Sequence, residues 1–112
     1  MKKAIAYHEL HLKSAQELGK RAEQGQAYGN LANAYHSLGD LNKAILNYTH
    51  SLHISKEVGD KAGVAKTNYN LGISCEELGA PAGALKFYQS SVEILNELRD
   101  SLQMKEIGRA HV

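Results

Sequence analysis

Residues 30–45 read NLANAYHSLGDLNKAI, and residues 70–85, forty positions later, read NLGISCEELGAPAGAL. The two stretches share Asn, Leu, Leu, Gly and Ala at matching places, while most of the residues between them differ. Self-similarity at a fixed period is the sequence signature of a repeat architecture. The stretch therefore predicts a chain that is built from units of forty residues.

The same period reaches the start of the chain. Three copies align at Ala4, Ala44 and Ala84; at Ile5, Ile45 and Leu85; at Leu12, Leu52 and Val92; and at Glu17, Glu57 and Glu97. This alignment divides the chain into the second helix of a partial repeat at 1–20, one repeat at 21–60, another at 61–100 and a stub at 101–112.

Glycine-containing turns divide each unit into two helices. Gly39–Asp40 and Gly59–Asp60 each supply a glycine that can adopt the left-handed conformation, and then an aspartate that can cap the next helix. At Gly79 the aspartate is missing, but Pro81 suits a first helical turn. The predicted helices are 2–18, 22–38, 41–58, 61–78 and 81–98.

Each predicted helix is amphipathic. In the second helix, three-and-four spacing relates Tyr28, Leu31, Ala32, Tyr35 and Leu38. Turns of two or three residues force neighbouring helices into antiparallel hairpins, and hairpins that repeat at a fixed period stack into a solenoid. The predicted fold class is all-α: an α-α superhelix of five helices in antiparallel hairpins.

The repeated positions resemble the tetratricopeptide repeat. One copy of that pattern is carried by Tyr28, Leu31, Ala32, Tyr35, Leu38, Gly39, Ala44 and Tyr48, and a second by Asn68, Leu71, Gly72, Cys75, Leu78, Gly79, Ala84 and Tyr88. The chain departs from the pattern at Ala32 (usually Gly), Asn68 (usually aromatic), Cys75 (usually Tyr), and Ser51 and Ser91 (usually Ala). The resemblance covers about residues 1–100, and it implies a solenoid that interacts with other proteins.

The period of forty is longer than the usual period of about 34 residues. The stretches QAYGNLANAYHSLGD (26–40) and HISKEVGDKAG (53–63) resemble two animal groups. The first is the very large repeat proteins similar to tetratricopeptide repeat protein 28, toward which YHELHLKSAQELG (7–19) and FYQSSVEILNELRDSLQ (87–103) lean, and the second is the Pins/LGN adaptors of spindle orientation. The resemblance to the first group implies a cytoplasmic, cytoskeleton-associated scaffold that is linked to the spindle midzone and cytokinesis, and thus to cell division.

The last seven residues, EIGRAHV at 106–112, break the repeat pattern. The same string results when a widely used sequencing adapter is translated in frame. We therefore interpret 106–112 as an adapter-derived tail and exclude it from the functional argument.

Charge and hydropathy exclude two classes of partner. The 13 basic and 12 acidic residues are interspersed and leave a net charge of +1, so no basic surface is expected that could follow a nucleic-acid backbone. No apolar run approaches the roughly 20 residues that span a bilayer, and the start MKKAIAYHEL is not a secretory signal. We expect a soluble, intracellular chain that contacts neither nucleic acid nor membrane.

No catalytic or metal-binding constellation emerges. His8 and His11 in HELH are three residues apart, whereas the zinc-protease motif places its histidines four apart on one helix face. His50 and His53 repeat that spacing out of register, and Cys75 replaces a buried aromatic without a histidine placed to activate it. We expect a non-enzymatic protein without cofactor or metal.

The remaining candidate is the concave side, which the first helix of each hairpin lines. Counting 100° per residue away from the packed stripe selects a row of eight candidate peptide-binding residues: Gln26, Asn30, Asn33, Ser37, Lys66, Asn70, Ile73 and Glu77. Asn30 and Asn70 recur at the period, and an amide can both donate to and accept from an extended peptide backbone. Equally, the two asparagines could bond between helices and only hold the stack together.

The sequence thus favours a protein–protein interaction module that binds a peptide or a partner protein on its concave surface. The alternative is a spacer or terminal segment of a longer array without a ligand of its own. In either case the exposed ends of the array predict self-association.

Overall fold

The computed structural model describes residues 1–110, and the side chains of residues 1–108, as five α-helices joined by tight turns. The helices are α1 (Lys2–Glu17), α2 (Arg21–Ser37), α3 (Leu41–Val58), α4 (Lys61–Leu78) and α5 (Pro81–Ala110). Residues 1–110 contain no strand, so the predicted all-α class is confirmed.

The four turns have the same backbone conformation. Gly19, Gly39, Gly59 and Gly79 follow one another every twenty residues, with φ of 66°, 79°, 75° and 88°. In each turn the residue after the glycine donates its N–H to a carbonyl five residues earlier, for example Asp40 to Tyr35 at 2.9 Å. Because glycine has no Cβ, it adopts this left-handed conformation without strain and ends each helix at a fixed place.

Local capping explains where the helices begin. Asp40 accepts a hydrogen bond from the N–H of Lys43 at 3.2 Å, and Asp60 accepts one from Gly63 at 2.9 Å. Both predicted aspartate caps are therefore confirmed. Lys20 occupies the equivalent position before α2 and has no side-chain cap.

The core is made of small residues and one ring. Ala32, Ala44, Tyr48 and Leu71 form a buried cluster that joins α2, α3 and α4. In the next hairpin, the ring of Tyr88 on α5 lies directly over Gly72 on α4. Small side chains let the helix axes approach closely, and an aromatic ring from the second helix of each hairpin fills the remaining space.

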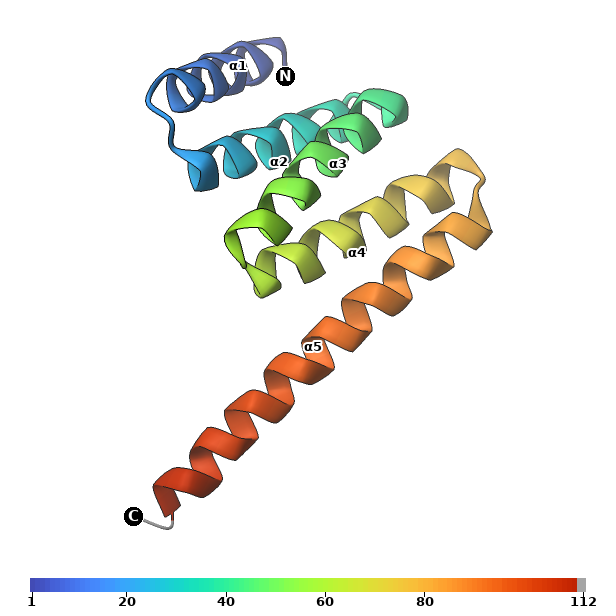
Figure 1. The fold of residues 1–112 in the computed structure, drawn as a ribbon. Helices are drawn as coiled ribbons and strands as arrows, with labels where there is room; N and C mark the ends of the chain where they lie inside the picture. The colour runs from blue at the N-terminus through green and yellow to red at the C-terminus, as the bar shows by residue number, and fades with distance from the viewer. Residues whose placement is uncertain (111–112) are drawn as a thin grey trace.

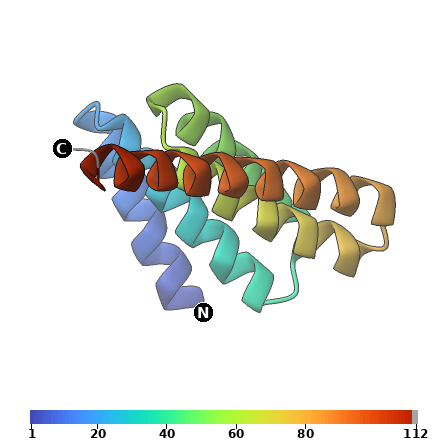
Figure 2. The ribbon, with the colours of Figure 1, turned by 90° about the horizontal axis from the view of Figure 1, so that it is seen from below.

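The helices lie side by side in chain order, as steps of an open stack (Figures 1 and 2). The molecule measures 54 × 38 × 20 Å, and its radius of gyration is 16.1 Å. A compact globule of this length would have a radius of gyration of about 13 Å. The exposed extension of α5 contributes to this length. Each helix packs mainly on its neighbours in the chain, which is the arrangement of a superhelix rather than of a closed bundle.

The prediction of helix ends is wrong at one place. Four helices begin and end within one residue of the predicted bounds, but α5 continues past residue 98 to Ala110 (Figure 1). The helix continues because neither glycine nor proline interrupts residues 99–107 and most of those residues favour helix. Of the tail 106–112, residues 111–112 lie outside the described residues, and its adapter origin stays a prediction.

None of the described helices is both long enough and apolar enough to span a membrane.

Candidate functional site

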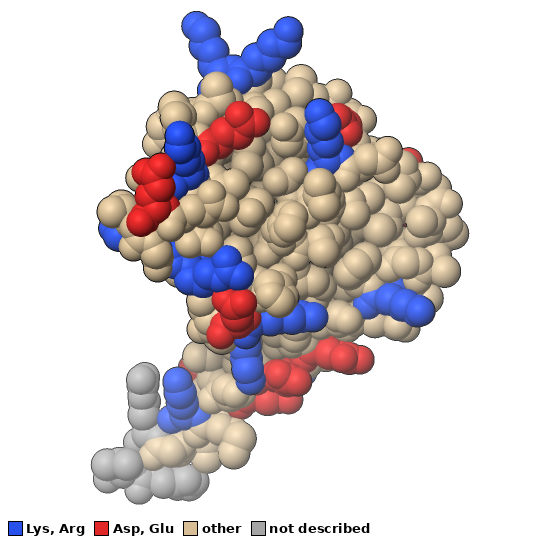
Figure 3. All heavy atoms as spheres, turned by 45° about the horizontal axis from the view of Figure 1, so that its top comes forward, with Lys and Arg blue, Asp and Glu red and all other residues tan. Residues whose placement is uncertain are grey.

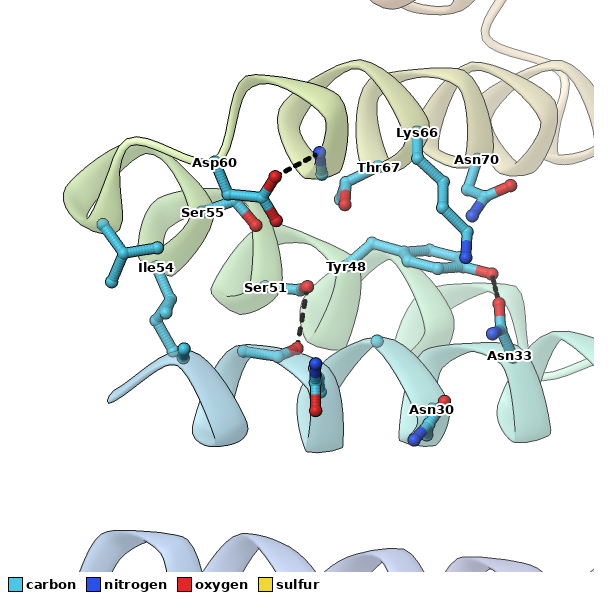
Figure 4. A pocket seen from close by; sticks show the side chains of 16 residues that line it. Asn30, Asn33, Tyr48, Ser51, Ile54, Ser55, Asp60, Lys66, Thr67 and Asn70 are labelled. Atoms are coloured by element: carbon cyan, nitrogen blue, oxygen red, sulfur yellow. Dashed lines mark hydrogen bonds between the residues drawn. The ribbon is translucent and has the colours of Figure 1, made fainter. Parts of the chain in front are cut away.

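A groove of about 590 Å³ runs between α2 and α4 over the side chains of α3 (Figure 4). Its sixteen lining residues come from these three helices and from the turn that precedes α4. Helix α2 forms one wall and α4 forms the other, while Tyr48 of α3 crosses between them. The repeated first helices of the two hairpins thus face one concave surface, as the sequence predicts.

Five of the eight predicted groove residues line this groove. Gln26, Asn30 and Asn33 come from α2, and Lys66 and Asn70 come from α4. All five are at least partly exposed to solvent, so their polar groups are accessible to a ligand.

The other three predicted residues, Ser37, Ile73 and Glu77, do not line the groove. Ser37 and Glu77 lie in the last turns of their helices, beyond the groove. Ile73 holds the position on α4 that Asn33 holds on α2, but only Asn33 lines the groove. Glu77 instead lies 2.9 Å from Nε2 of His36, and this contact joins the ends of α2 and α4.

Two hydrogen bonds fix the floor of the groove. The Tyr48 hydroxyl donates to Oδ1 of Asn33, and the Ser51 hydroxyl donates to the carbonyl of Gly25 at 2.9 Å (Figure 4). Neither bond involves Asn30 or Asn70, whose amides remain available in the groove. Burial raises the pKa of Tyr48, so this phenol stays a neutral donor at physiological pH.

The charged groups of the groove are Lys66 and Asp60. Lys66 extends from α4 toward the Tyr48 hydroxyl, and its side chain is exposed (Figure 4). The Asp60 carboxylate accepts from the first turn of α4 and is compensated by that helix terminus. The groove therefore presents one cation among several amides and hydroxyls, which suits hydrogen bonding to an extended chain.

The residues that sequence reasoning missed come from α3. Tyr48, Ser51, Ile54 and Ser55 form the floor of the groove, and all four are buried. Three-and-four spacing relates these four residues on α3 and is the signal in the sequence that could have found them. Residues that pack against neighbouring helices can also border a groove and contact a ligand there.

Ion pairs join the two helices of each hairpin. Nε of Arg21 on α2 lies 2.6 Å from Oε2 of Glu57 on α3, and forty residues later Nζ of Lys61 lies 3.7 Å from Oε2 of Glu97. Figure 3 shows both signs of charge interspersed around the rim of the visible face, with a broad area between them that carries neither. This distribution agrees with the low net charge.

The residues weighed for chemistry do not assemble. In residues 1–110, no group of three or more His, Cys, Asp and Glu side chains is placed to hold a metal ion. Cys75 is buried, and burial raises the pKa of its thiol, which favours the unreactive protonated form.

Comparisons with known proteins agree on one family. A sequence profile of the tetratricopeptide repeat matches residues 25–57, which are most of the α2–α3 hairpin. The crystal structure of the TPR domain of Arabidopsis FLU superposes with a TM-score of 0.80 at 26% identity, covering 86% of this chain and 81% of that one. Residues 25–57 match the tetratricopeptide repeat, and residues along the chain share the fold of a tetratricopeptide-repeat domain. Proteins with these repeats generally mediate protein–protein interactions, and the fold is typically that of a non-enzymatic scaffold.

Curated relatives match about two fifths of the chain. Human G-protein-signaling modulator 1 is 48% identical over 42 residues, and the mouse and rat proteins of the same name are 45% identical over 42 residues. Each alignment covers 38% of this chain but only 6% of the relative. The similarity therefore concerns about one repeat and not the whole of those proteins.

Proposed function

We propose that the concave groove between α2 and α4 binds an extended peptide segment of a partner protein. The observation that carries this proposal is a groove of about 590 Å³ whose walls carry amides at Gln26, Asn30 and Asn70 and one cation at Lys66. Extended peptide backbones offer alternating donors and acceptors, which side-chain amides can satisfy in either sense.

The two first helices have distinct roles in this proposal. Asn30 on α2 and Asn70 on α4 bond to the peptide backbone, because they occupy the same register on opposite walls. Asn33 is held by Tyr48 and helps to fix the floor, so its oxygen is less available to a ligand. The absence of hydrogen bonds from Asn30 and Asn70 to the groove floor supports the binding interpretation over a purely structural one.

A peptide array tests the proposal. The chain is screened against overlapping 15-residue peptides, and the affinity of each retained peptide is measured by fluorescence anisotropy. We expect the double variant Asn30→Ala/Asn70→Ala to bind tenfold or more weakly, since each amide hydrogen bond contributes roughly 1 kcal/mol.

Asn42 and Asn96 provide a matched control. Both are exposed asparagines, on α3 and α5, and neither lines the groove. The double variant Asn42→Ala/Asn96→Ala should bind like the unmodified chain. If the two double variants bind peptides equally well, Asn30 and Asn70 have no role in recognition.

The alternative is a spacer that has no ligand of its own. This function is favoured by the exposed apolar residues of α5. They form a surface like the one through which α3 packs against α4. The same array distinguishes the two functions: a spacer retains no peptide above background, whereas the groove retains a consistent set.

The cellular setting remains a proposal. We expect a cytoplasmic, cytoskeleton-associated role at the spindle midzone in cytokinesis, on the basis of the resemblance to large animal repeat proteins. The name of G-protein-signaling modulator 1 refers instead to G-protein signalling, although the shared region is only 6% of that protein. Fluorescent tagging in dividing cells tests this setting: a uniform signal throughout anaphase would contradict the midzone role.

A further inference from the structure

A second hollow lies outside the concave groove, on the side of α4 that faces away from it. Two adjoining cavities of about 270 and 420 Å³ run over α4 between α3 and α5, and we call them together the outer trough. Val64, Lys56, Ile94 and Glu97 line both cavities. None of the outer-trough residues except Ser55 also lines the concave groove, so the outer trough is a separate surface.

The outer trough has apolar walls and a polar group in its larger cavity. Leu52 of α3, Val64 of α4, and Phe87 and Ile94 of α5 supply the apolar surface. Asn68 of α4 lines the same cavity and is only 4% exposed. The Asn68 amide is not among the fully buried side-chain atoms of the described residues that lack a hydrogen-bond partner, so it remains accessible from the cavity that it lines.

The first hairpin shows what can occupy this place. Shifted by forty residues, Asn68 corresponds to Tyr28 and Ser90 corresponds to His50. Tyr28 and His50 stack on each other, with ring centroids 4.7 Å apart and planes inclined by 24°. The second hairpin therefore has two small polar side chains where the first has a pair of stacked rings.

Phe87 compensates for only part of this loss. It stands where the first hairpin has Asn47, and it packs against the central core cluster. The hollow nevertheless persists beside it at about 420 Å³. A flat ring is thus missing at a position where the chain itself, one repeat earlier, places one.

We propose that the outer trough is an interaction site that accepts one tyrosine side chain from a partner protein. The tyrosine ring enters the larger cavity beside Asn68 and Phe87, between the apolar walls of α3 and α5, and fills space that aromatic rings fill in the first hairpin. Its hydroxyl bonds to the Asn68 amide, which lines the same cavity. Such a site is independent of the peptide groove on the opposite side of α4.

The charges at the rim fit a segment of low net charge. Lys61 and Glu97 pair with each other at 3.7 Å. The other charged residues of the rim are two lysines, Lys56 and Lys86, and one glutamate, Glu93. With a surplus of one positive charge, the rim imposes little electrostatic selection. Shape and the Asn68 amide therefore determine which side chain the outer trough accepts.

Capped amino acids serve as probes of this site. The isotope-labelled full chain is titrated with N-acetyltyrosinamide, N-acetylphenylalaninamide and N-acetylalaninamide while backbone amide chemical shifts are recorded. We expect saturable shifts that cluster at Val64, Asn68 and Phe87 for the tyrosine probe. Binding should be several-fold weaker for the phenylalanine probe, which leaves Asn68 unpaired, and absent for the alanine probe.

Two variants make the test decisive. Asn68→Tyr/Ser90→His recreates the ring pair of the first hairpin and should abolish the shifts by filling the outer trough. Asn68→Leu leaves the outer trough open and apolar, and it should remove the preference for the tyrosine probe over the phenylalanine probe. This variant still tests the proposal if Asn68→Tyr/Ser90→His does not fold. The groove variant Asn30→Ala/Asn70→Ala should bind the tyrosine probe normally.

Two results would overturn the proposal. One is an unchanged response of the filled variant to the tyrosine probe, and the other is a set of shifts spread over the surface instead of clustered at the outer trough. Either result can occur whether or not the concave groove binds peptides, so the two proposals fail separately.

Discussion

At the scale of single residues, Gly72 marks the closest approach between α4 and α5. A Cβ atom added there would lie 2.5 Å from Cε1 and 2.6 Å from Cδ1 of Tyr88. We expect Gly72→Ala to destabilise the chain by about 1–3 kcal/mol, because the ring must leave its place and overpacking costs that much in well-packed cores. Urea unfolding followed by circular dichroism measures the change.

Gly83 is the matched control for this substitution. A Cβ added at Gly83 would meet only Sγ of Cys75, at 4.0 Å, which is ordinary contact. Gly83→Ala should be neutral or stabilise α5 by up to about 1 kcal/mol, since alanine favours helix over glycine. Equal free energies of unfolding for Gly72→Ala and Gly83→Ala would show that the packing of the Tyr88 ring does not require glycine at position 72.

Ser51 and Ser91 form the same buried hydrogen bond in successive hairpins. Ser51 donates to the carbonyl of Gly25 at 2.9 Å, and Ser91 donates to that of Ala65 at 2.8 Å. We expect Ser51→Ala and Ser91→Ala each to lower the free energy of unfolding by about 1 kcal/mol, additively, because the two sites do not touch. Chemical denaturation of both single variants and the double variant checks this; a strongly non-additive double variant would contradict it.

Acid weakens the ion pair between α2 and α3. The hydrogen bond from Arg21 lowers the pKa of Glu57 below its ordinary value of 4.5, so the pair adds stability above that pH and loses it as the pH falls through the lowered pKa. The melting temperatures of the unmodified chain and Arg21→Gln should therefore differ most near neutral pH and converge as the pH falls through the lowered pKa of Glu57. A difference that stays constant down to pH 2 would contradict this.

At the scale of helices, α5 has two parts with different surroundings. Residues 81–98 pack along α4, whereas the described side chains of residues 99–108 are all exposed. Removal of residues 99–112 should leave the free energy of unfolding within about 0.5 kcal/mol of the full chain, as for surface changes that remove no packing. Loss of a cooperative melt in the shortened chain would show that the extension packs on the body.

At the scale of the whole molecule, the stack ends in an uncovered apolar face. Leu85 and Val92 on α5 are 57% and 56% exposed, whereas their equivalents on α3, Ile45 and Leu52, are partly buried against the core cluster. Apolar surface that is covered within the stack tends to associate when it is left open. We expect the isolated chain to self-associate through this face.

Sedimentation velocity at rising concentration tests the self-association. The variant Val92→Lys/Leu95→Lys should remain monomeric at concentrations at which the unmodified chain forms larger species. Leu46→Lys is the control, because Leu46 is an exposed leucine on α3 within the stack. Self-association that persists in Val92→Lys/Leu95→Lys would assign it to another surface.

The sequence determined the turns and the helix order of this protein. Gly39, Gly59 and Gly79 end helices because glycine alone adopts positive φ without strain, and Asp40 and Asp60 begin helices because they cap free N–H groups. These effects act within a few residues, so a single sequence reveals them. The fixed period then implies stacking, because each hairpin can bury its apolar face only against the next.

Only the tertiary structure decided which residues share a hollow. An angular count along one helix places Ile73 and Glu77 on the same face as Asn70, but neither residue lines the groove, because the extent of the groove depends on how α2, α3 and α4 cross. The outer trough arises in the same way, from two small residues on α4 and α5, Asn68 and Ser90, that lie far apart in the chain. Cavities are spaces between elements, and their limits follow from the packing of several helices rather than from the pattern of any one of them.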